Sequence, residues 1–190
     1  MPARDAPNLA SPALESVSQA DFAQAMRQHV SSVCVITTKL DRHRFGLTAT
    51  AVSSVSAQPP RVLVCVNKSS FTHSKIAEAG VFCVNVLSEM QDVVAKAFAG
   101  MLGANVDRFG AAKWTEISTG APVLIGAAAA FDCVLFETLE QSTHSIFLGD
   151  VVGVSSHAGL ESLLYASRKF RQLRKIFSSL ESNDGETLHF

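Results

Sequence analysis

Short apolar runs separated by turn residues dominate the chain between residues 33 and 155. The runs are rich in Val, Ile, Thr, Cys and Phe, a composition that is typical of β-strands. They predict six strands, over residues 33–38, 47–56, 61–67, 81–87, 127–140 and 146–155. Strands at these intervals indicate a closed or nearly closed antiparallel sheet.

Apolar residues at helical spacing predict three short helices beside these strands. The first follows Ser18, a candidate N-cap, and its apolar positions are Phe22, Ala25, Met26 and Val30. The second begins at Ser70 and ends at Gly80. Ser88 and Gln91 have the spacing of a capping box at the start of the third. This third helix is expected to turn four residues inward: Val93, Val94, Ala97 and Phe98.

The chain divides into an arm, one domain and a tail. Residues 1–17 hold three prolines among small and polar residues, which predicts a loosely ordered N-terminal arm. Residues 18–180 contain every expected element, and a chain of 190 residues suits a single domain with a real core. A last amphipathic stretch over residues 160–180 holds the main basic concentration of the chain, and residues 181–190 form a C-terminal tail.

Composition narrows the class of protein. Hydrophobic residues make up 47% of the chain and charged residues 17%, so some apolar surface needs a cover, which a homodimer would supply. The net charge of -1 provides no basic field and argues against a nucleic-acid binder. No apolar segment approaches the roughly 18 residues that a membrane span requires, and we expect a cytoplasmic protein.

The four cysteines Cys34, Cys65, Cys83 and Cys133 each lie in an apolar run, without the short spacings of zinc or redox pairs. We therefore expect free, buried thiols. No His, Asp or Glu pair has metal-ligand spacing, so no metal site is expected. Nucleophile-elbow, dinucleotide-fingerprint and P-loop motifs are also absent from the sequence.

Residues 46–56 are unusual because small side chains occupy a predicted strand. Strict alternation would place one set on a common face: Thr48, Thr50, Val52, Ser54 and Ser56. Such a strand cannot fill a deep core. It lets a flat molecule lie against the backbone, where amide groups and short hydroxyls meet polar edges, and a flavin ring is such a molecule.

Residues 62–75 run from a strand into hydroxyl residues that open a helix. Free N–H groups at a helix N-terminus favour an anion, and Lys68 or Lys75 would add charge, with His73 nearby. Ordinary N-capping explains the same hydroxyls, so both interpretations stay open. His144 falls at an expected hairpin, where a ring that enters a cleft and a surface turn histidine are equally open.

Taken together, these segments are similar to the short-chain flavin reductase family, the reductase partners of two-component flavin-dependent monooxygenases. The similar segments occur in the family's order, over residues 22–26, 35–38, 46–56, 59–66, 82–87, 98–100, 107–109, 120–124, 144–151 and 163–165. The resemblance implies a mainly β fold, a split β-barrel with Greek-key topology and a few flanking short helices. It also implies a homodimer with flavin bound in a groove near the subunit interface.

By the same resemblance, one set of residues binds the flavin ring: Thr48, Ala49, Thr50, Ala51, Val52, Ser54 and Val55. A second set cradles the phosphate: Ser69, Ser70, Phe71, Ser74 and Lys75. His144 corresponds to the family histidine beside the nicotinamide and is the expected catalytic residue. A further set approaches the pyridine nucleotide: Ser167, Arg168, Lys169 and Phe170.

The chain departs from the family's pattern at two places. Ser142-Thr143 precedes His144 where the family often has Gly-Asp, which removes a carboxylate that would orient the ring. Arg168 and Phe170 stand where a glycine and a tyrosine are typical. Arg168 either favours the extra phosphate of NADPH or crowds the site, so the choice between NADH and NADPH stays open.

The expected function is an NAD(P)H:flavin oxidoreductase, which transfers hydride from nicotinamide C4 to flavin N5 and supplies reduced FMN or FAD to a separate monooxygenase. In such an enzyme the cofactors carry the chemistry and the protein positions them. Two alternatives remain open. One is a flavin-binding carrier or electron-transfer protein without reductase activity, and the other is an interaction barrel without a cofactor.

Overall fold

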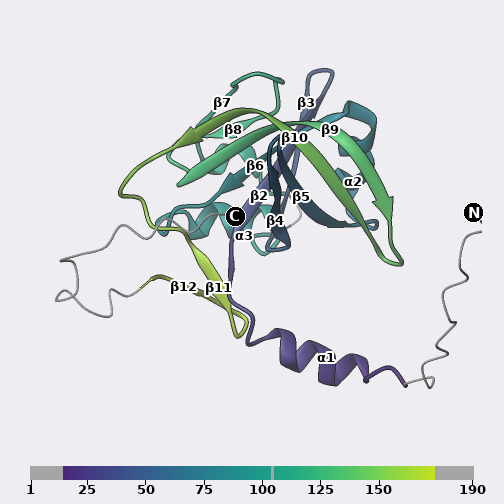
Figure 1. Ribbon diagram of the computed structural model, residues 1–190. Helices are drawn as coiled ribbons and strands as arrows, with labels where there is room; N and C mark the ends of the chain where they lie inside the picture. Colours follow the sequence, from purple (N-terminus) through teal and green to yellow (C-terminus); the bar gives the residue numbers. More distant parts are fainter. Residues whose placement is uncertain (1–14, 104, 174–190) are drawn as a thin grey trace, which may run out of the picture.

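The computed structural model describes residues 15–103 and 105–173 (Figure 1). Of the expected N-terminal arm it describes only residues 15–17, and the expected tail over residues 181–190 lies outside the described part. Strands dominate the fold, and seven of them form the main sheet. They are β2 (Cys34–Leu40), β3 (His43–Ala49), β4 (Val52–Ala57), β5 (Pro60–Asn67), β6 (Val81–Val86), β9 (Ala129–Glu140) and β10 (His144–Ser156).

The order of strands in this sheet is β3-β2-β6-β9-β10-β5-β4, with antiparallel neighbours throughout. β5 and β6 follow one another in the chain but lie apart in the sheet, because β9 and β10 occupy the space between them. This crossover is typical of a Greek key. The expected mainly β split barrel with short flanking helices is therefore confirmed.

The two edge strands, β3 and β4, are consecutive in the chain, and this corrects one expectation. The prediction of a single strand over residues 47–56 is wrong, because the chain leaves β2 at Ala49 and joins β5 from Val52 onward. Between them, the Ala51 carbonyl accepts a hydrogen bond from Cys65 N at 2.9 Å. The small side chains here provide little of the cross-strand packing that would stabilise one long strand. The chain instead changes its pairing partner from β2 to β5, and this change curves the sheet into a barrel.

The three expected helices are present as α1 (Gln19–Met26), α2 (Phe71–Ala79) and α3 (Asp92–Phe98). Ser18 caps α1 by accepting from Asp21 N, and Gly80 ends α2 with the left-handed φ of 68° that favours glycine. Before α3, the Gln91 side chain accepts from Ser88 N at 3.0 Å, which is one half of a capping box.

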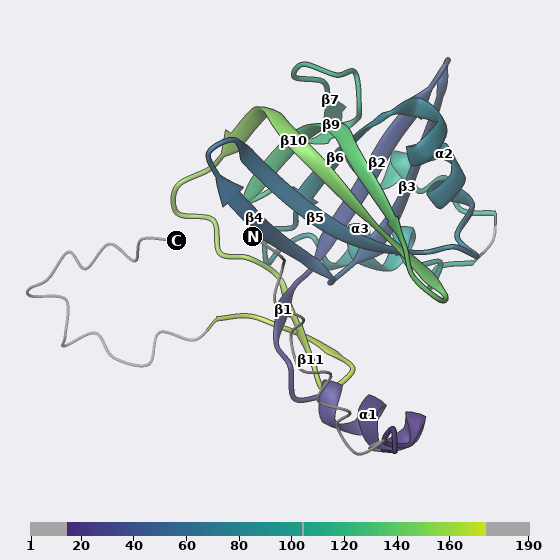
Figure 2. The ribbon, with the colours of Figure 1, turned by 45° about the vertical axis from the view of Figure 1, so that its right-hand side comes forward.

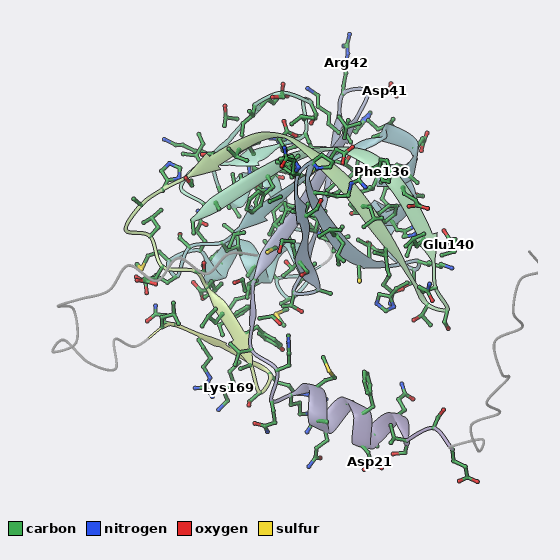
Figure 3. The ribbon with its side chains drawn as sticks, in the orientation of Figure 1. Asp21, Asp41, Arg42, Phe136, Glu140 and Lys169 are labelled. Atoms are coloured by element: carbon green, nitrogen blue, oxygen red, sulfur yellow. The ribbon has the colours of Figure 1, made fainter. Side chains whose placement is uncertain are left out.

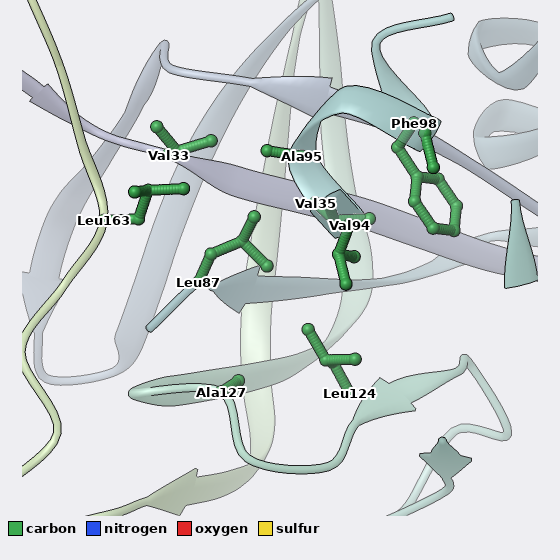
Figure 4. Close-up of a cluster of buried hydrophobic side chains, with 10 residues drawn as sticks. Val33, Val35, Leu87, Val94, Ala95, Phe98, Leu124, Ala127 and Leu163 are labelled. Atoms are coloured by element: carbon green, nitrogen blue, oxygen red, sulfur yellow. The ribbon is translucent and has the colours of Figure 1, made fainter. Parts of the chain in front are cut away.

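The expected inward face of α3 needs one correction. Val93 is 53% exposed, whereas Val94, Ala95, Ala97 and Phe98 are buried. The buried face of this short helix is centred between these four residues, and Val93 falls beyond its margin. Figure 4 shows Ala95 and Val94 beside Val33 and Leu87 in the resulting cluster, with Leu163 at one side of it and Phe98 at the other.

A second cluster fills the barrel itself, around the fully buried Ile76, Phe82 and Phe147. Outside the barrel, the segment 112–128 covers β2, β6 and β9, and it contains β7 (Trp114–Thr115) and β8 (Val123–Leu124) after the 3₁₀ helix η1 (Phe109–Ala111). Buried Asn85 and Asp132 hold this segment. Asn85 accepts from Leu124 N at 2.7 Å, and Asp132 accepts from the amides of residues 118 and 119. As a result, β6 is buried on both faces.

A separate three-stranded sheet consists of β1 (Ser31–Ser32), β11 (Leu164–Ala166) and β12 (Lys169–Arg171). It lies with α1 below the barrel in both views (Figures 1 and 2). The described part of the expected amphipathic stretch over residues 160–180 is therefore the β11–β12 hairpin. None of the helices in the described residues is both long and apolar enough to span a membrane.

Candidate functional site

The open edge of the barrel carries a groove of about 550 Å³. One wall is the segment at which the chain passes from β3 to β4, and it consists of residues with small side chains: Thr50, Ala51, Val52, Ser53 and Ser54. β5, which is hydrogen-bonded to β4, continues this surface through Val62, Leu63 and Cys65. The groove therefore has a flat floor of backbone and short side chains. This arrangement fits a planar ring and offers it amide and hydroxyl groups.

Sequence reasoning missed several residues that line this groove: His29, Val30, Ser31, Ser32, Cys34, Cys65, Val86 and Phe131. A signal for Cys65 was available, because the expected strand over residues 61–67 alternates and turns Cys65 away from buried Val64 and Val66. Burial raises the pKa of the Cys65 thiol, which is neutral in the physiological range. All four cysteines are free thiols, but the expectation that all four are buried is wrong for Cys65, which is only partly buried.

Three of the seven residues expected at the flavin ring lie outside this groove. The Thr48 hydroxyl donates to the Ala95 carbonyl of α3 at 2.8 Å, and Ala49 packs against the barrel core. Val55 is 47% exposed and lies at the irregularity in the pairing of β4 with β5, between Ser54 and Ser56. Thr50, Ala51, Val52 and Ser54 are the members that the structure brings together.

β5 leads from the groove to the expected phosphate site, because it ends at Asn67, close to the start of α2. Ser70 is the N-cap of α2, and its hydroxyl makes no capping hydrogen bond. The amide of Phe71, the first residue of α2, is one of the N–H groups that have no partner within the helix. The Ser70 hydroxyl and the Phe71 amide are therefore placed to receive an anion.

The remaining phosphate candidates have partners within the protein. Ser69 donates through both its amide and its hydroxyl to Asn67 Oδ1, at 2.9 and 2.8 Å. The Ser74 hydroxyl donates to the Phe71 carbonyl at 3.3 Å. Lys75 pairs with Glu78 at 2.6 Å, and the other nearby cation, Lys68, pairs with Glu140. An anion bound here would therefore meet neutral donors rather than an unpaired lysine.

His144 begins β10 directly opposite Asn67, so the structure places it beside the candidate anion site. Its Nδ1 lies 2.8 Å from the Thr143 hydroxyl. Thr143 therefore provides a polar partner for the ring at the position where the family often has a carboxylate. The hydroxyl is neutral, so this partner orients the imidazole without adding a charge.

The other expected nicotinamide residues lie in the β11–β12 hairpin, whose two turn residues are Ser167 and Arg168. Their φ values of 50° and 63° lie in the left-handed region, which explains why glycine suits position 168. The Ser167 amide donates to the Arg27 carbonyl at the end of α1 at 2.9 Å, and the Phe170 ring packs against Tyr165.

The hairpin and His144 are in different parts of the chain's fold. Figure 3 labels Lys169 on the hairpin below the barrel and Glu140 at the far end of β9, beside the turn that leads to His144. Within one chain the structure therefore does not bring the two halves of the expected nicotinamide site together. Among the described residues, no group of three His, Cys, Asp or Glu side chains has the arrangement of a metal site.

Comparison with known proteins decides the family. The family model described as "Flavin reductase like domain" matches residues 26–174. The chain belongs to this family. FMN reductase (NADH) RutF 2 of Methylorubrum extorquens (strain PA1) is 41% identical over 159 residues, which are 84% of this chain and 92% of that protein.

Solved structures of flavin reductases have the same fold. Flavin reductase PheA2 in its native state superposes with a TM-score of 0.77 at 32% identity, over 84% of this chain and all of that one. BorF, the flavin reductase component of a bacterial two-component tryptophan halogenase, gives a TM-score of 0.75 at 32% identity, over 82% of this chain and 98% of that one. Flavin reductases, one of them a component of a two-component system, are thus among the structural relatives of this chain.

Proposed function

We propose that the protein is an NAD(P)H-dependent flavin reductase that supplies reduced FMN or FAD to a separate oxygenase. One observation carries this proposal. The groove is lined by small residues and by β5, and Ser70, whose hydroxyl makes no capping hydrogen bond, follows shortly after the end of β5. Relatives named as NADH-dependent FMN reductases support NADH as the hydride donor. The relative BorF, named as the reductase component of a two-component halogenase, supports a separate partner.

The residues of this chain would bind and orient rather than exchange protons. Hydride transfer from nicotinamide C4 to flavin N5 is the chemistry that the two bound nucleotides supply. Thr50, Ala51, Val52 and Ser54 would hold the ring, with the amides and hydroxyls of this segment near the edge that becomes more negative on reduction. Ser70 and the Phe71 amide would hold the phosphate. His144, oriented by Thr143, would stand beside the nicotinamide.

We also propose a homodimer. α1 has no buried residue, and two of its apolar side chains, Phe22 and Met26, are 59% and 49% exposed. Among the described residues β4 pairs with β5 alone, and it contains no buried residue. A second copy would cover both surfaces. It would also bring its β11–β12 hairpin to the groove and complete a nicotinamide site that one chain leaves in two parts.

A cytoplasmic location is part of the proposal. Four unpaired thiols, three of them buried, suit a reducing compartment, and reduced nicotinamide nucleotides are the expected substrates.

The first experiment is anaerobic: catalytic amounts of protein are mixed with FMN, FAD or riboflavin, and NADH or NADPH is added. Loss of the visible flavin absorbance supports the reductase and reports both specificities. Flavin binding without loss of absorbance contradicts the reductase and supports a carrier. A protein that binds no flavin contradicts both and favours an interaction barrel.

The groove is tested by Ala51→Trp, because a large ring at this exposed position would occupy the space proposed for flavin. We expect flavin affinity to fall by about 100-fold or more with an unchanged melting temperature. Val154→Trp is the matched control, since Val154 is 65% exposed and does not line the groove. Equal flavin affinity in the two variants would remove the groove from the proposal.

A further inference from the structure

A chain of polar contacts runs from the first turn of α2 to the end of the β9–β10 hairpin. His73 Nε2 lies 2.8 Å from Ser145 Oγ. The Ser145 hydroxyl donates to Glu140 Oε1 at 3.1 Å, and the other oxygen of Glu140 pairs with Lys68. Ser145 is fully buried, and the His73 ring packs on Phe147 with a centroid distance of 5.1 Å. None of the roles assigned above uses His73 or Ser145.

Which side chain donates in each of these hydrogen bonds follows from the chemistry of the side chains. The hydrogen bond from Lys68 holds the pKa of Glu140 below its usual value, so this carboxylate is ionised and only accepts. Ser145 has one hydroxyl proton and gives it to Glu140. Its oxygen therefore accepts from His73, which carries a proton on Nε2. Each of these hydrogen bonds thus joins one donor to one acceptor.

This geometry also excludes a nucleophilic role for Ser145. A serine nucleophile needs an accessible oxygen whose proton passes to a neighbouring histidine. Here the oxygen is fully buried, and its proton is directed to the carboxylate. The hydrogen bonds among His73, Ser145 and Glu140 consequently have a structural role, because they connect α2 to the β9–β10 hairpin.

Contacts between α2 or the preceding loop and the β9–β10 hairpin lie on both sides of the candidate anion site. His73 is the third residue of α2, and its amide donates to the carbonyl of Ser70, the N-cap, at 3.0 Å. On the other side of the site, Lys68 N donates to the Thr143 carbonyl, also at 3.0 Å. The loop that contains Ser70 is thus fastened to the β9–β10 hairpin before and after the anion site. A binding group that is fixed in this way does not lose conformational freedom when its ligand arrives.

We propose that His73 is a positioning residue for the flavin phosphate. By binding Ser145 it sets the first turn of α2 against β10 and so fixes the Ser70 hydroxyl and the Phe71 amide toward the anion. This proposal rests on the proposed function for the identity of the ligand. It assigns the phosphate, rather than the ring, as the part of flavin whose binding depends on His73.

FMN and riboflavin differ only in the phosphate, and their comparison tests the proposal. Binding of each flavin is measured by fluorescence quenching without nicotinamide, in the full-length protein. For His73→Leu we expect the Kd of FMN to rise about tenfold and the Kd of riboflavin to stay unchanged. Ser145→Ala should reproduce this difference. His73→Gln, whose amide nitrogen can still reach Ser145, should restore most of the FMN affinity.

His157→Leu is the matched control. His157 follows the opposite end of β10, and its side chain makes one hydrogen bond, from Nδ1 to the Ala127 carbonyl at 3.0 Å. We expect it to bind both flavins as the unaltered protein does. A histidine that only supports the fold would, when changed, weaken FMN and riboflavin equally.

Three results would overturn the proposal: equal weakening of both flavins in His73→Leu, unchanged FMN affinity in that variant, or an unaltered protein that binds FMN and riboflavin equally. Reductase activity is a separate readout. A protein that shows the expected FMN-specific loss but reduces no flavin would contradict the proposed function and leave the role of His73 standing.

Discussion

β6 and β4 belong to the same sheet but differ in burial and in the number of strands with which they pair. Four of the six residues of β6 are buried, because one face packs into the barrel and the other lies under the segment 112–128. β4 has no buried residue, and β5 is its one pairing partner in the described part of the chain. Buried apolar area is the main source of folding free energy, so β6 contributes much of the stability and β4 little. The open edge instead leaves exposed the surface that we propose for ligands and a second copy.

The largest effect that sharpens this comparison is expected from a pair of phenylalanines. Phe82 on β6 is fully buried, and Phe22 on α1 is 59% exposed. Phe82→Ala should lower the free energy of unfolding by about 3–5 kcal/mol, since it removes buried contacts and leaves a cavity. Phe22→Ala should change that of the monomer by less than about 0.5 kcal/mol. Chemical denaturation at low protein concentration measures both.

Sedimentation of the same two variants completes the test. Phe22→Ala should weaken self-association, because the exposed ring is part of the surface proposed for the second copy. A Phe22 variant that is as unstable as the Phe82 variant, while remaining monomeric, would show that α1 belongs to the folding core and would break the comparison.

A smaller loss is expected at Gly149 on β10. A Cβ atom at this position would meet the Phe82 ring and would lie 2.8 Å from Cys133 Cβ. Gly149→Ala should cost about 1–3 kcal/mol of stability through overpacking of the barrel. The cost should be smaller when Phe82 is also changed to Leu, so a double-mutant cycle in denaturant reports the coupling. Additive effects would mean that the two positions do not share the same space.

Most of the fold was predictable because its elements repeat a simple pattern. Apolar runs bounded by turn residues gave β5, β6, β9 and β10 within a few residues of their ends. The pattern failed where packing between elements decides the outcome. Residues 50 and 51 connect β3, which pairs with β2, to β4, which pairs with β5. The local run of Ala, Thr and Ser does not predict this change of pairing partner.

The candidate site was predictable in part, for a related reason. Small residues and a helix N-terminus indicated the groove and the anion site, since local sequence creates both. Partners from distant segments were not visible. That Lys68 is paired with Glu140, and Lys75 with Glu78, depends on the hairpin and helix geometry, so the sequence overstated the positive charge at the anion site.

The smallest expected effect concerns the reactivity of the cysteines. One labelling experiment compares the accessibility of thiols in the core with that of Cys65 in the groove. Burial raises the pKa of Cys34 and of Cys133 to about 12, and that of Cys83 also lies well above its usual value. Cys65 is half-buried in the groove, and its pKa is raised less. A thiol reagent should therefore modify one cysteine in the native protein and four in denaturant.

The pH dependence and the effect of ligand identify which thiol reacts. Because the thiolate is the reactive form and the pKa of Cys65 lies above 9.0, the native rate should rise about tenfold for each pH unit up to pH 9. Cys65→Ser should abolish native labelling, and bound FMN should slow it by covering the groove wall. Labelling that FMN does not alter would place the flavin away from β5. Native labelling of several thiols would instead show that the barrel opens as readily as its edge, and the contrast between β6 and β4 would then be one of exposure rather than of stability.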